Sequence, residues 1–266
     1  MLVLDHICKT FNLNTADEKT ALDDLSLKVN DGDFITIIGS NGAGKSTLFN
    51  MIAGTFISDK GTILLDGEDI TFVPEHIRSR KIGRLFQDPM SGTCPDLSIE
   101  ENMGLAYLQS RNRPLFSRLS REDKKYLKER VAMLGMGLED RMNSPMGLLS
   151  GGQRQALTLL MATLAKPDLL LLDEHTAALD PATADKVIAI TRNIVDENKI
   201  TTLMITHNMH QALEIGNRTL MMKDGKIIFD CSGEERKNYT VNDLLNKFRE
   251  NSGEELDNDR MMLGID

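Results

Sequence analysis

A glycine-rich turn between an apolar run and a helical pattern constrains this 266-residue chain more than any other feature. The run FITII at 34–38 indicates a buried strand, and GSNGAGKST at 39–47 follows it directly. After the turn, STLFNMIAG predicts a helix that ends at Gly54. The turn fits G-x-x-x-x-G-K-[ST] in full, and a preceding strand with a following helix is the context in which that pattern forms a phosphate-binding loop.

The residue types in this turn suit the phosphates of a nucleotide. Glycine at 39, 42 and 44 lets backbone N–H groups point into one concavity at the start of the helix, which favours anions. Lys45 would bridge the β- and γ-phosphates, and the Ser46 hydroxyl would bind Mg²⁺. We therefore predict ATP and Mg²⁺ as ligands, with the nucleotide held by Gly39, Ser40, Asn41, Gly42, Ala43, Gly44, Lys45, Ser46 and Thr47.

Strand and helix patterns alternate around this turn, which predicts an α/β fold with a parallel sheet, the core of a P-loop NTPase. Short strands at 2–8, 22–29 and 62–65 predict an antiparallel β subdomain near the N-terminus. Residues 97–146 have helical spacing and predict a helical insertion of about five segments. Asp224-Gly225 between apolar runs predicts a β-hairpin.

Domain boundaries follow from these patterns. We expect one ATPase domain at 1–248, with antiparallel strands and core in approximately 1–88 and 150–248 and a helical subdomain in approximately 89–149. The remaining residues, 249–266, form a polar, acidic tail that is expected to fray or to serve as an interaction segment.

Charge and cysteine content exclude several classes of protein. A net charge of −9 argues against binding nucleic acid or a lipid surface through bulk attraction. Cys8, Cys94 and Cys231 form no Cys-x-x-Cys pair, so neither a zinc site nor a disulfide framework is expected, and a reducing cytosol suits them. No apolar run approaches the roughly 18–20 residues that cross a bilayer, so a soluble chain is expected whose membrane role comes through a partner.

Further polar groups follow predicted buried strands. LLLLDE at 169–174 ends in two carboxylates that point to opposite sides of an extended chain, so they can have different tasks. We predict that Asp173 holds Mg²⁺ and that Glu174 orients and deprotonates the water that attacks the γ-phosphate. His207 follows the strand pattern at 200–206, where its imidazole can hydrogen-bond the γ-phosphate, although a structural role is the commoner one for a single histidine.

The segment LLSGGQRQ at 148–155 combines a helix cap with two glycines. Ser150 and Gln153 fit a capping box, in which each side chain satisfies a backbone N–H of the other residue. Glycine in a helix costs about 0.8–1 kcal/mol relative to alanine, so we expect that something approaches this backbone closely. One chain could fold this segment onto its own nucleotide, or the segment could serve a second chain.

Together these motifs resemble the ATP-binding cassette (ABC) ATPase family, over roughly residues 2–248. The resemblance rests on the phosphate loop, Gln87 in RLFQDP, LSGGQ at 149–153, LLLLDE at 169–174, ALD at 178–180 and His207, in that order. It implies that two copies pack head to tail, with each ATP between the phosphate loop of one copy and the LSGGQ segment of the other. The partner's γ-phosphate would then be bound by Ser150, Gly151, Gly152 and Gln153.

The resemblance also implies roles for residues outside the strongest motifs. Phe11, in KTFN, matches the aromatic residue that stacks on adenine, and Asp180 matches a loop that touches the other copy's phosphate site. Gln87 is a candidate for contact with Mg²⁺ or the attacking water. In the family, the nearby surface receives a short helix from a membrane subunit, and the candidates for this groove are Met90, Thr93 and Leu97.

Two positions depart from the family's pattern. His175 stands in DEHT where members commonly have proline, and Ala177 stands where they commonly have serine. We expect His175 to be half-exposed in a turn, with electrostatic tuning of Glu174 as the other interpretation. Neither departure removes a catalytic group, so ATP hydrolysis is expected.

One cassette without a membrane segment suits the ATPase subunit of a bacterial ABC transporter, above all an importer. It would lie at the cytoplasmic face of the membrane, bound through separate permease subunits, with a second copy of itself and an extracytoplasmic substrate-binding protein as further partners. Nucleic acid is not an expected partner. A soluble ABC ATPase of an assembly machine, such as iron–sulfur cluster biogenesis, is the alternative, whereas a P-loop kinase would not explain LSGGQ.

Within the transporters, LDEHTAALDP at 172–181 and ITHNMHQALEIGNRTLMM at 205–222 resemble a bacterial uptake group. Its permeases are similar to those of branched-chain amino-acid importers, and some members are assigned to aromatic amino acids such as tryptophan. Cassette subunits do not normally touch the cargo, so the substrate is implied by this resemblance alone.

Overall fold

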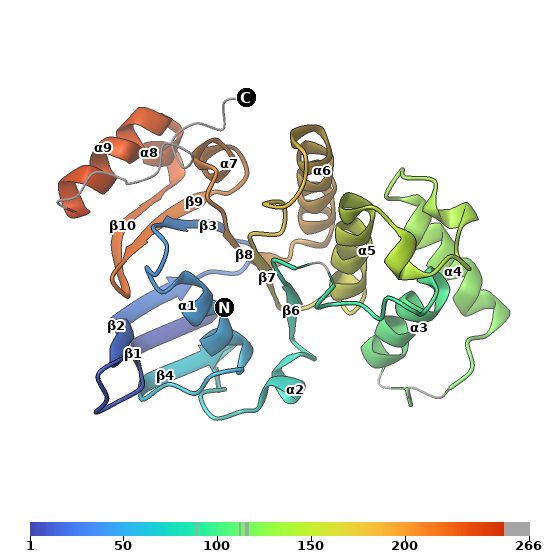
Figure 1. Ribbon diagram of the computed structural model, residues 1–266, viewed down its shortest axis with the longest axis horizontal. Coiled ribbons are helices and arrows are strands. Elements are labelled where there is room, and N and C mark those ends of the chain that lie inside the picture. The colour runs from blue at the N-terminus through green and yellow to red at the C-terminus, as the bar shows by residue number, and fades with distance from the viewer. Residues whose placement is uncertain (89, 112, 115–116, 253–266) are drawn as a thin grey trace. The chain divides into compact units, whose positions relative to one another are not determined.

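The chain divides into two units in the computed structural model, and each unit has strands and helices of its own (Figure 1). Unit 1 comprises Met1–Ser79 and Thr201–Asp266, and unit 2 comprises Arg80–Ile200. The structure describes residues 1–88, 90–111, 113–114 and 117–252. The subdomain boundaries expected near residues 88 and 149 stay a prediction.

Unit 1 contains an antiparallel sheet whose strands bury one face. These strands are β1 (Leu2–Phe11), β2 (Lys19–Val29), β4 (Lys60–Leu65) and β5 (Glu68–Asp69), in the order β2-β1-β4-β5. Leu2, Leu4 and Ile7 are buried while Asp5 is exposed, because antiparallel sheets commonly place one face on an apolar core and the other in water. The antiparallel β layer predicted near the N-terminus is confirmed.

The second sheet region of unit 1 is mainly parallel. It contains β3 (Phe34–Gly39), β8 (Thr201–Ile205), β9 (Arg218–Lys223) and β10 (Lys226–Ser232). Strand β3 pairs in parallel with β8 on one side and with β9 on the other, and β9 pairs antiparallel with β10. Asp224 and Gly225 have φ of 48° and 77°, the left-handed pair that a two-residue hairpin turn needs, so the predicted hairpin is confirmed.

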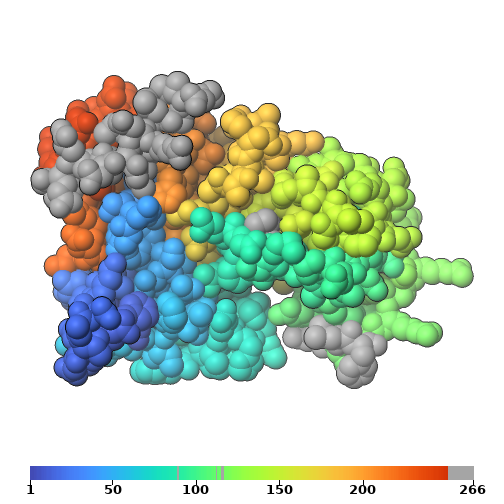
Figure 2. All heavy atoms as spheres, viewed as in Figure 1, coloured from blue at the N-terminus to red at the C-terminus, as the bar shows by residue number. Residues whose placement is uncertain are grey.

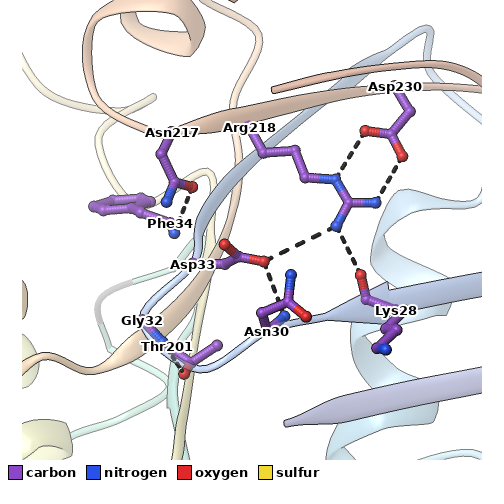
Figure 3. Close-up of polar contacts among 9 residues, drawn as sticks. All are labelled: Lys28, Asn30, Gly32, Asp33, Phe34, Thr201, Asn217, Arg218 and Asp230. Atoms are coloured by element: carbon purple, nitrogen blue, oxygen red, sulfur yellow. Dashed lines mark hydrogen bonds and ion pairs between the residues drawn. The ribbon is translucent and has the colours of Figure 1, made fainter. Parts of the chain in front are cut away.

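Polar contacts tie the amino end of β3 to its neighbours (Figure 3). Arg218 on β9 donates two hydrogen bonds to the Asp230 carboxylate on β10, at 2.8 and 2.6 Å, and a third to the backbone oxygen of Lys28 on β2 at 2.7 Å. The backbone N–H of Phe34 donates to the side-chain oxygen of Asn217 at 3.0 Å. The Phe34 contact holds β3 at its amino end, and the other end of this strand leads into the phosphate loop.

The helices of unit 1 follow its strands. They are α1 (Lys45–Ala53), α2 (Glu75–Arg78), α7 (Met209–Glu214), α8 (Gly233–Lys237) and α9 (Val241–Ser252). Helix α1 ends as predicted, at Gly54, whose φ of 88° is the left-handed conformation of a helix C-terminus. An apolar cluster that includes Ile38, Met209 and Phe248 joins β3, α7 and α9. The tail predicted at 249–266 begins inside α9, which continues to Ser252, and its residues from 253 onward lie outside the described part of the chain.

Unit 2 places two parallel strands beside a group of helices. The strands are β6 (Ile82–Leu85) and β7 (Leu169–Asp173), and the helices are α3 (Ile99–Ser110), α4 (Arg121–Ala132), α5 (Gly151–Thr163), α6 (Pro181–Asn198) and the 3₁₀ turns η1 (Leu138–Asp140) and η2 (Met146–Leu148). Ile99, Leu127, Leu157 and their neighbours form the apolar core of these helices. Four helical segments begin within the described part of 97–146, where the sequence predicted about five.

Most residues of α4 are charged, and most of the helix is not buried. Ser120 caps this helix, and only Leu127 and Val131 are buried within it. Figure 2 shows long side chains of this region, in green, that project into solvent. Among the described residues, no helix has both the length and the apolar character of a membrane span.

Candidate nucleotide-binding site

The phosphate loop at 39–47 connects β3 to α1, as predicted. Gly42 and Gly44 adopt φ of 81° and 99°, which residues with a Cβ rarely tolerate. A Cβ on Gly44 would also clash with the backbone oxygen of Ala21 on β2. The loop therefore needs glycine at these positions to turn into the helix, and a helix N-terminus is a favourable place for an anion.

Lys45 folds back over the loop that precedes it. Its Nζ donates hydrogen bonds to the backbone oxygens of Gly39 at 2.7 Å and Ser40 at 3.0 Å, and the side chain is buried. Ser46, by contrast, is exposed at the start of α1. The loop thus carries the buried ammonium group of Lys45 and the exposed hydroxyl of Ser46. An ammonium group suits phosphate oxygens, and a hydroxyl suits a divalent cation bound to them. Of the other residues predicted to bind the nucleotide, Asn41 is exposed, Ser40 and Thr47 are half-buried, and Ala43 is buried.

His207 lies at the same edge of unit 1 as the phosphate loop. Ile37 on β3 pairs with Ile205 on β8, so the residues that follow these two strands leave the sheet side by side. His207 is half-buried and precedes Asn208, which caps α7 by accepting from the Gln211 backbone N–H. A contact of its imidazole with the γ-phosphate stays a prediction.

Phe11 ends β1 in unit 1. Its ring packs edge-on against Phe56, with centroids 5.3 Å apart, and the Nζ of Lys9 lies 5.6 Å from its centroid. Phe11 is half-buried, so part of its ring stays accessible. Stacking on adenine is therefore compatible with its surroundings and stays a prediction.

In unit 2, the acidic pair follows β7 as the sequence predicts. Asp173 is 8% exposed, and the guanidinium of Arg84 on β6 lies 4.0 Å from its carboxylate. Glu174 has φ of 47°, a left-handed conformation that costs a non-glycine residue of order 1–3 kcal/mol and is concentrated at functional sites. Leu85 pairs with Leu172, so exposed Gln87 leaves the same edge of this strand pair as Glu174.

The expectation for His175 is wrong in one respect. Its side chain is not half-exposed but buried, with 3% of its surface accessible. The ring Nε2 lies 3.3 Å from the hydroxyl of Thr191 on α6, and burial lowers the pKa of His175 to about 4. His175 is therefore a neutral side chain packed against α6, whereas the sequence predicted a half-exposed side chain in a turn.

The Ser-Gly-Gly-Gln segment begins α5 with the predicted capping box. The Gln153 backbone N–H donates to Ser150 Oγ at 3.3 Å, and the Ser150 backbone N–H donates to Gln153 Oε1 at 3.2 Å. Ser150 and Gly151 are exposed while Gly152 is buried. Two of these residues are thus open to a second molecule, and the third faces its own chain.

Within this chain, helix α6 packs closely against the buried Gly152. A Cβ on Gly152 would clash with Cγ2 of Thr183, and one on Gly151 would lie 3.1 Å from Cδ2 of Leu179. Asp180 caps α6 by accepting from the Thr183 backbone N–H at 3.1 Å, and hydrogen bonds from Thr183 lower the pKa of this carboxyl. Sequence reasoning missed Thr183 because nothing in the local pattern shows which helix crosses a given glycine.

The structure thus assembles the candidate residues in two groups. Unit 1 holds the phosphate loop, Phe11 and His207, and unit 2 holds Gln87, the acidic pair, the capped start of α5 and Asp180. Within the described residues, no group of three or more His, Cys, Asp or Glu side chains could hold a metal ion by itself.

Comparison with known proteins shows the family of the chain. Residues 22–177 match the ABC transporter family. The chain is 42% identical over 248 residues to a tyrosine transport ATP-binding protein of Clostridioides difficile, which covers 93% of this chain and 98% of the relative. It is 34% identical over 232 residues to a xylose/arabinose import ATP-binding protein of Sulfolobus acidocaldarius, covering 86% of this chain and 88% of that one.

Solved structures give the same result. An ATP-binding cassette solved as a dimer in a post-hydrolysis state, bound to ADP and Pi, aligns with a TM-score of 0.74 and 27% identity. The alignment covers 87% of this chain and 98% of the cassette. The family match spans more than half of the chain, and a relative at 42% identity is covered almost completely. The chain therefore belongs to the ABC transporter family and is the ATP-binding, ATP-hydrolysing subunit of a transporter.

Proposed function

We propose that this chain drives the import of an aromatic amino acid, with tyrosine as the first candidate. The observation that carries this proposal is the 42% identity to a tyrosine transport ATP-binding protein over almost the full length of both chains. The identity to a sugar import subunit is lower, at 34%. The aromatic uptake group that the sequence resembles leads to the same class of cargo.

The working unit of this proposal is a head-to-tail dimer of two copies. Its support is the dimeric state of the aligned cassette and the exposure of Ser150 and Gly151 at the start of α5. The N-terminus of this 13-residue helix carries a partial positive charge, which favours the γ-phosphate of an ATP held by the other copy. Binding of two ATP molecules would close the dimer, and hydrolysis would remove the bridges and let it open.

Mg²⁺ fits the side chains proposed to hold it. The Ser46 hydroxyl, the Asp173 carboxylate and the Gln87 amide are hard oxygen ligands, and too few in number to hold the ion without phosphate oxygens and water. When bound, Mg²⁺ neutralises charge that develops on the β- and γ-phosphates. Lys45 would contribute its cation to the same phosphates.

Glu174 is the proposed base for the attacking water. Its left-handed backbone, with φ of 47°, turns the chain directly after β7, which ends at Asp173. His207 would hydrogen-bond the γ-phosphate and hold it in line with the water. Asp180, already fixed as the cap of α6, is proposed to touch the other copy's phosphate site.

The proposed permease contact lies in unit 2, on the segment that precedes α3. Met90 is 37% exposed there, and its sulfur accepts from the Arg154 guanidinium at 2.8 Å. Asn102 fixes the same segment, because its side-chain oxygen accepts from the Cys94 backbone N–H at 2.8 Å. A pre-formed surface of this kind, completed by Thr93 and Leu97, would receive a short helix of a permease at the cytoplasmic face of the membrane.

A mild-detergent pull-down of the tagged chain, followed by mass spectrometry, tests the proposal first. We expect a multi-span permease, together with an extracytoplasmic substrate-binding protein. The reconstituted complex should then hydrolyse ATP faster with the loaded binding protein and tyrosine than with tyrosine withheld. Recovery of soluble partners only would favour the assembly ATPase instead, and stimulation by a sugar but not by tyrosine would refute the proposed cargo.

A further inference from the structure

Lys19, which no motif of the sequence singles out, lies beside the phosphate loop. It begins β2, and its Nζ is 3.3 Å from the position that a Cβ on Gly42 would occupy. Gly42 is exposed in the loop, between the residues that Lys45 contacts and the start of α1. An ammonium group therefore borders the loop at Gly42, whereas Lys45 contacts it at Gly39 and Ser40.

The strand register places this lysine next to the predicted adenine contact. Phe11 on β1 pairs directly with Lys19 on β2. Side chains of directly opposed residues in an antiparallel pair lie on the same face of the sheet, about 4.5–5.5 Å apart at Cβ. Lys19 thus spans the distance between the aromatic ring and the loop, both of which belong to unit 1.

The charge of Lys19 is available to a ligand. Among the residues that the structure describes, its side chain makes no hydrogen bond and no ion pair, and it is exposed. The adjacent carboxylate of Glu18 is engaged elsewhere, since it accepts from the Asn14 backbone N–H at 2.7 Å. A free ammonium group beside a glycine loop is a second cation for the phosphate chain, in addition to Lys45.

We infer that Lys19 is a nucleotide-binding residue that contacts the phosphate nearest the ribose. This inference rests on the nucleotide site proposed above. Its geometric basis is that the side chain starts beside the adenine contact and ends beside the loop. Lys45 serves the β- and γ-phosphates, so the two lysines hold opposite ends of one triphosphate. ATP and ADP both carry the phosphate that Lys19 contacts.

The test compares nucleotide affinities of matched lysine variants by isothermal titration calorimetry. We expect Lys19→Met to raise the Kd for ATP and for ADP by the same factor, about 5–10, because one charge-assisted hydrogen bond is lost. Lys19→Arg should retain most of the affinity. Lys28→Met is the control, since Lys28 is an exposed lysine on the same strand, and the substitution removes the same charge.

Three results would overturn the inference. These are equal Kd values for Lys19→Met and wild type, an equal loss in Lys28→Met, or a loss for ATP without one for ADP. Lys45→Ala, measured in parallel, separates this failure from failure of the whole site. If Lys45→Ala weakens ATP binding while Lys19→Met does not, only the role of Lys19 falls; if neither weakens it, the phosphate-loop assignment itself falls.

Discussion

The glycines of the phosphate loop and those at the start of α5 serve different physical needs. Gly42 and Gly44 have left-handed φ angles, and a Cβ on Gly44 would meet a backbone oxygen. Gly151 and Gly152 are ordinary helical residues, and a Cβ on either would meet a side chain of α6 or of the loop before it. One pair is required by the backbone's own conformation, and the other by what packs against it.

This difference determines which substitutions a second mutation can repair. A backbone oxygen cannot be shortened, and a left-handed φ remains unfavourable whatever its neighbours are. A neighbouring side chain, however, can be replaced by a smaller one. We therefore expect suppressor mutations for the α5 glycines and none for the loop glycines.

The largest effect is expected for Gly44→Ala. The left-handed conformation costs alanine about 1–2 kcal/mol, and the clash with the Ala21 backbone adds the 1–3 kcal/mol typical of overpacking. Thermal unfolding should show the destabilisation, and calorimetry should show ATP affinity reduced by more than about 100-fold. Ala21→Gly should not rescue it, because the clashing oxygen remains; rescue would break the comparison.

Gly152→Ala comes next, and it should be repairable. Alanine gains about 1 kcal/mol of helix propensity there but overpacks Thr183 by about 1–3 kcal/mol, and we expect ATPase activity to fall about tenfold as α5 shifts. Thr183→Ser removes the clashing Cγ2 and keeps the backbone N–H that Asp180 accepts from. In the double variant, stability and ATPase activity should both return.

If stability returned without activity, Gly152 would be needed at the partner's phosphate and not only against α6. Thr183→Ser alone is the control and should keep wild-type turnover. Unfolding midpoints and steady-state rates of the three variants decide between these results.

Gly151→Ala sharpens the comparison, because Gly151 is exposed. The flexible end of Leu179 can yield to a Cβ at 3.1 Å, so the free energy of unfolding should change by less than about 1 kcal/mol. ATPase activity should nevertheless fall, because an added methyl group would separate the helix start from the other copy's γ-phosphate. Wild-type cooperative turnover in this variant would contradict the shared site.

The smallest effect is expected for Ser150→Ala. It removes one half of the capping box and should cost about 1 kcal/mol of stability, measured by chemical denaturation. Ser120→Ala is the matched control, since it removes the same kind of cap from α4, away from the proposed site. Both should lose similar stability, and only Ser150→Ala should slow ATP turnover; equal turnover in both would limit Ser150 to capping.

Much of the fold and the composition of the candidate site could be predicted from the sequence. The phosphate loop, the end of α1 at Gly54, the hairpin at Asp224-Gly225 and the capping box at Ser150 all form as expected. Each depends on residues a few positions apart, so a contiguous pattern contains the whole physical requirement. The alternation of strands and helices likewise predicted a parallel sheet, and the short strand patterns at 2–8, 22–29 and 62–65 predicted an antiparallel β layer.

Only the tertiary structure decided which distant residues these motifs meet. It buries His175 against Thr191, places Thr183 on Gly152, brings Arg84 to Asp173 and sets Lys19 beside Gly42. These contacts depend on how helices cross and how strands register. Spacing along one chain does not specify such packing, whereas backbone dihedral angles and hydrogen bonds between residues i and i+3 are set locally.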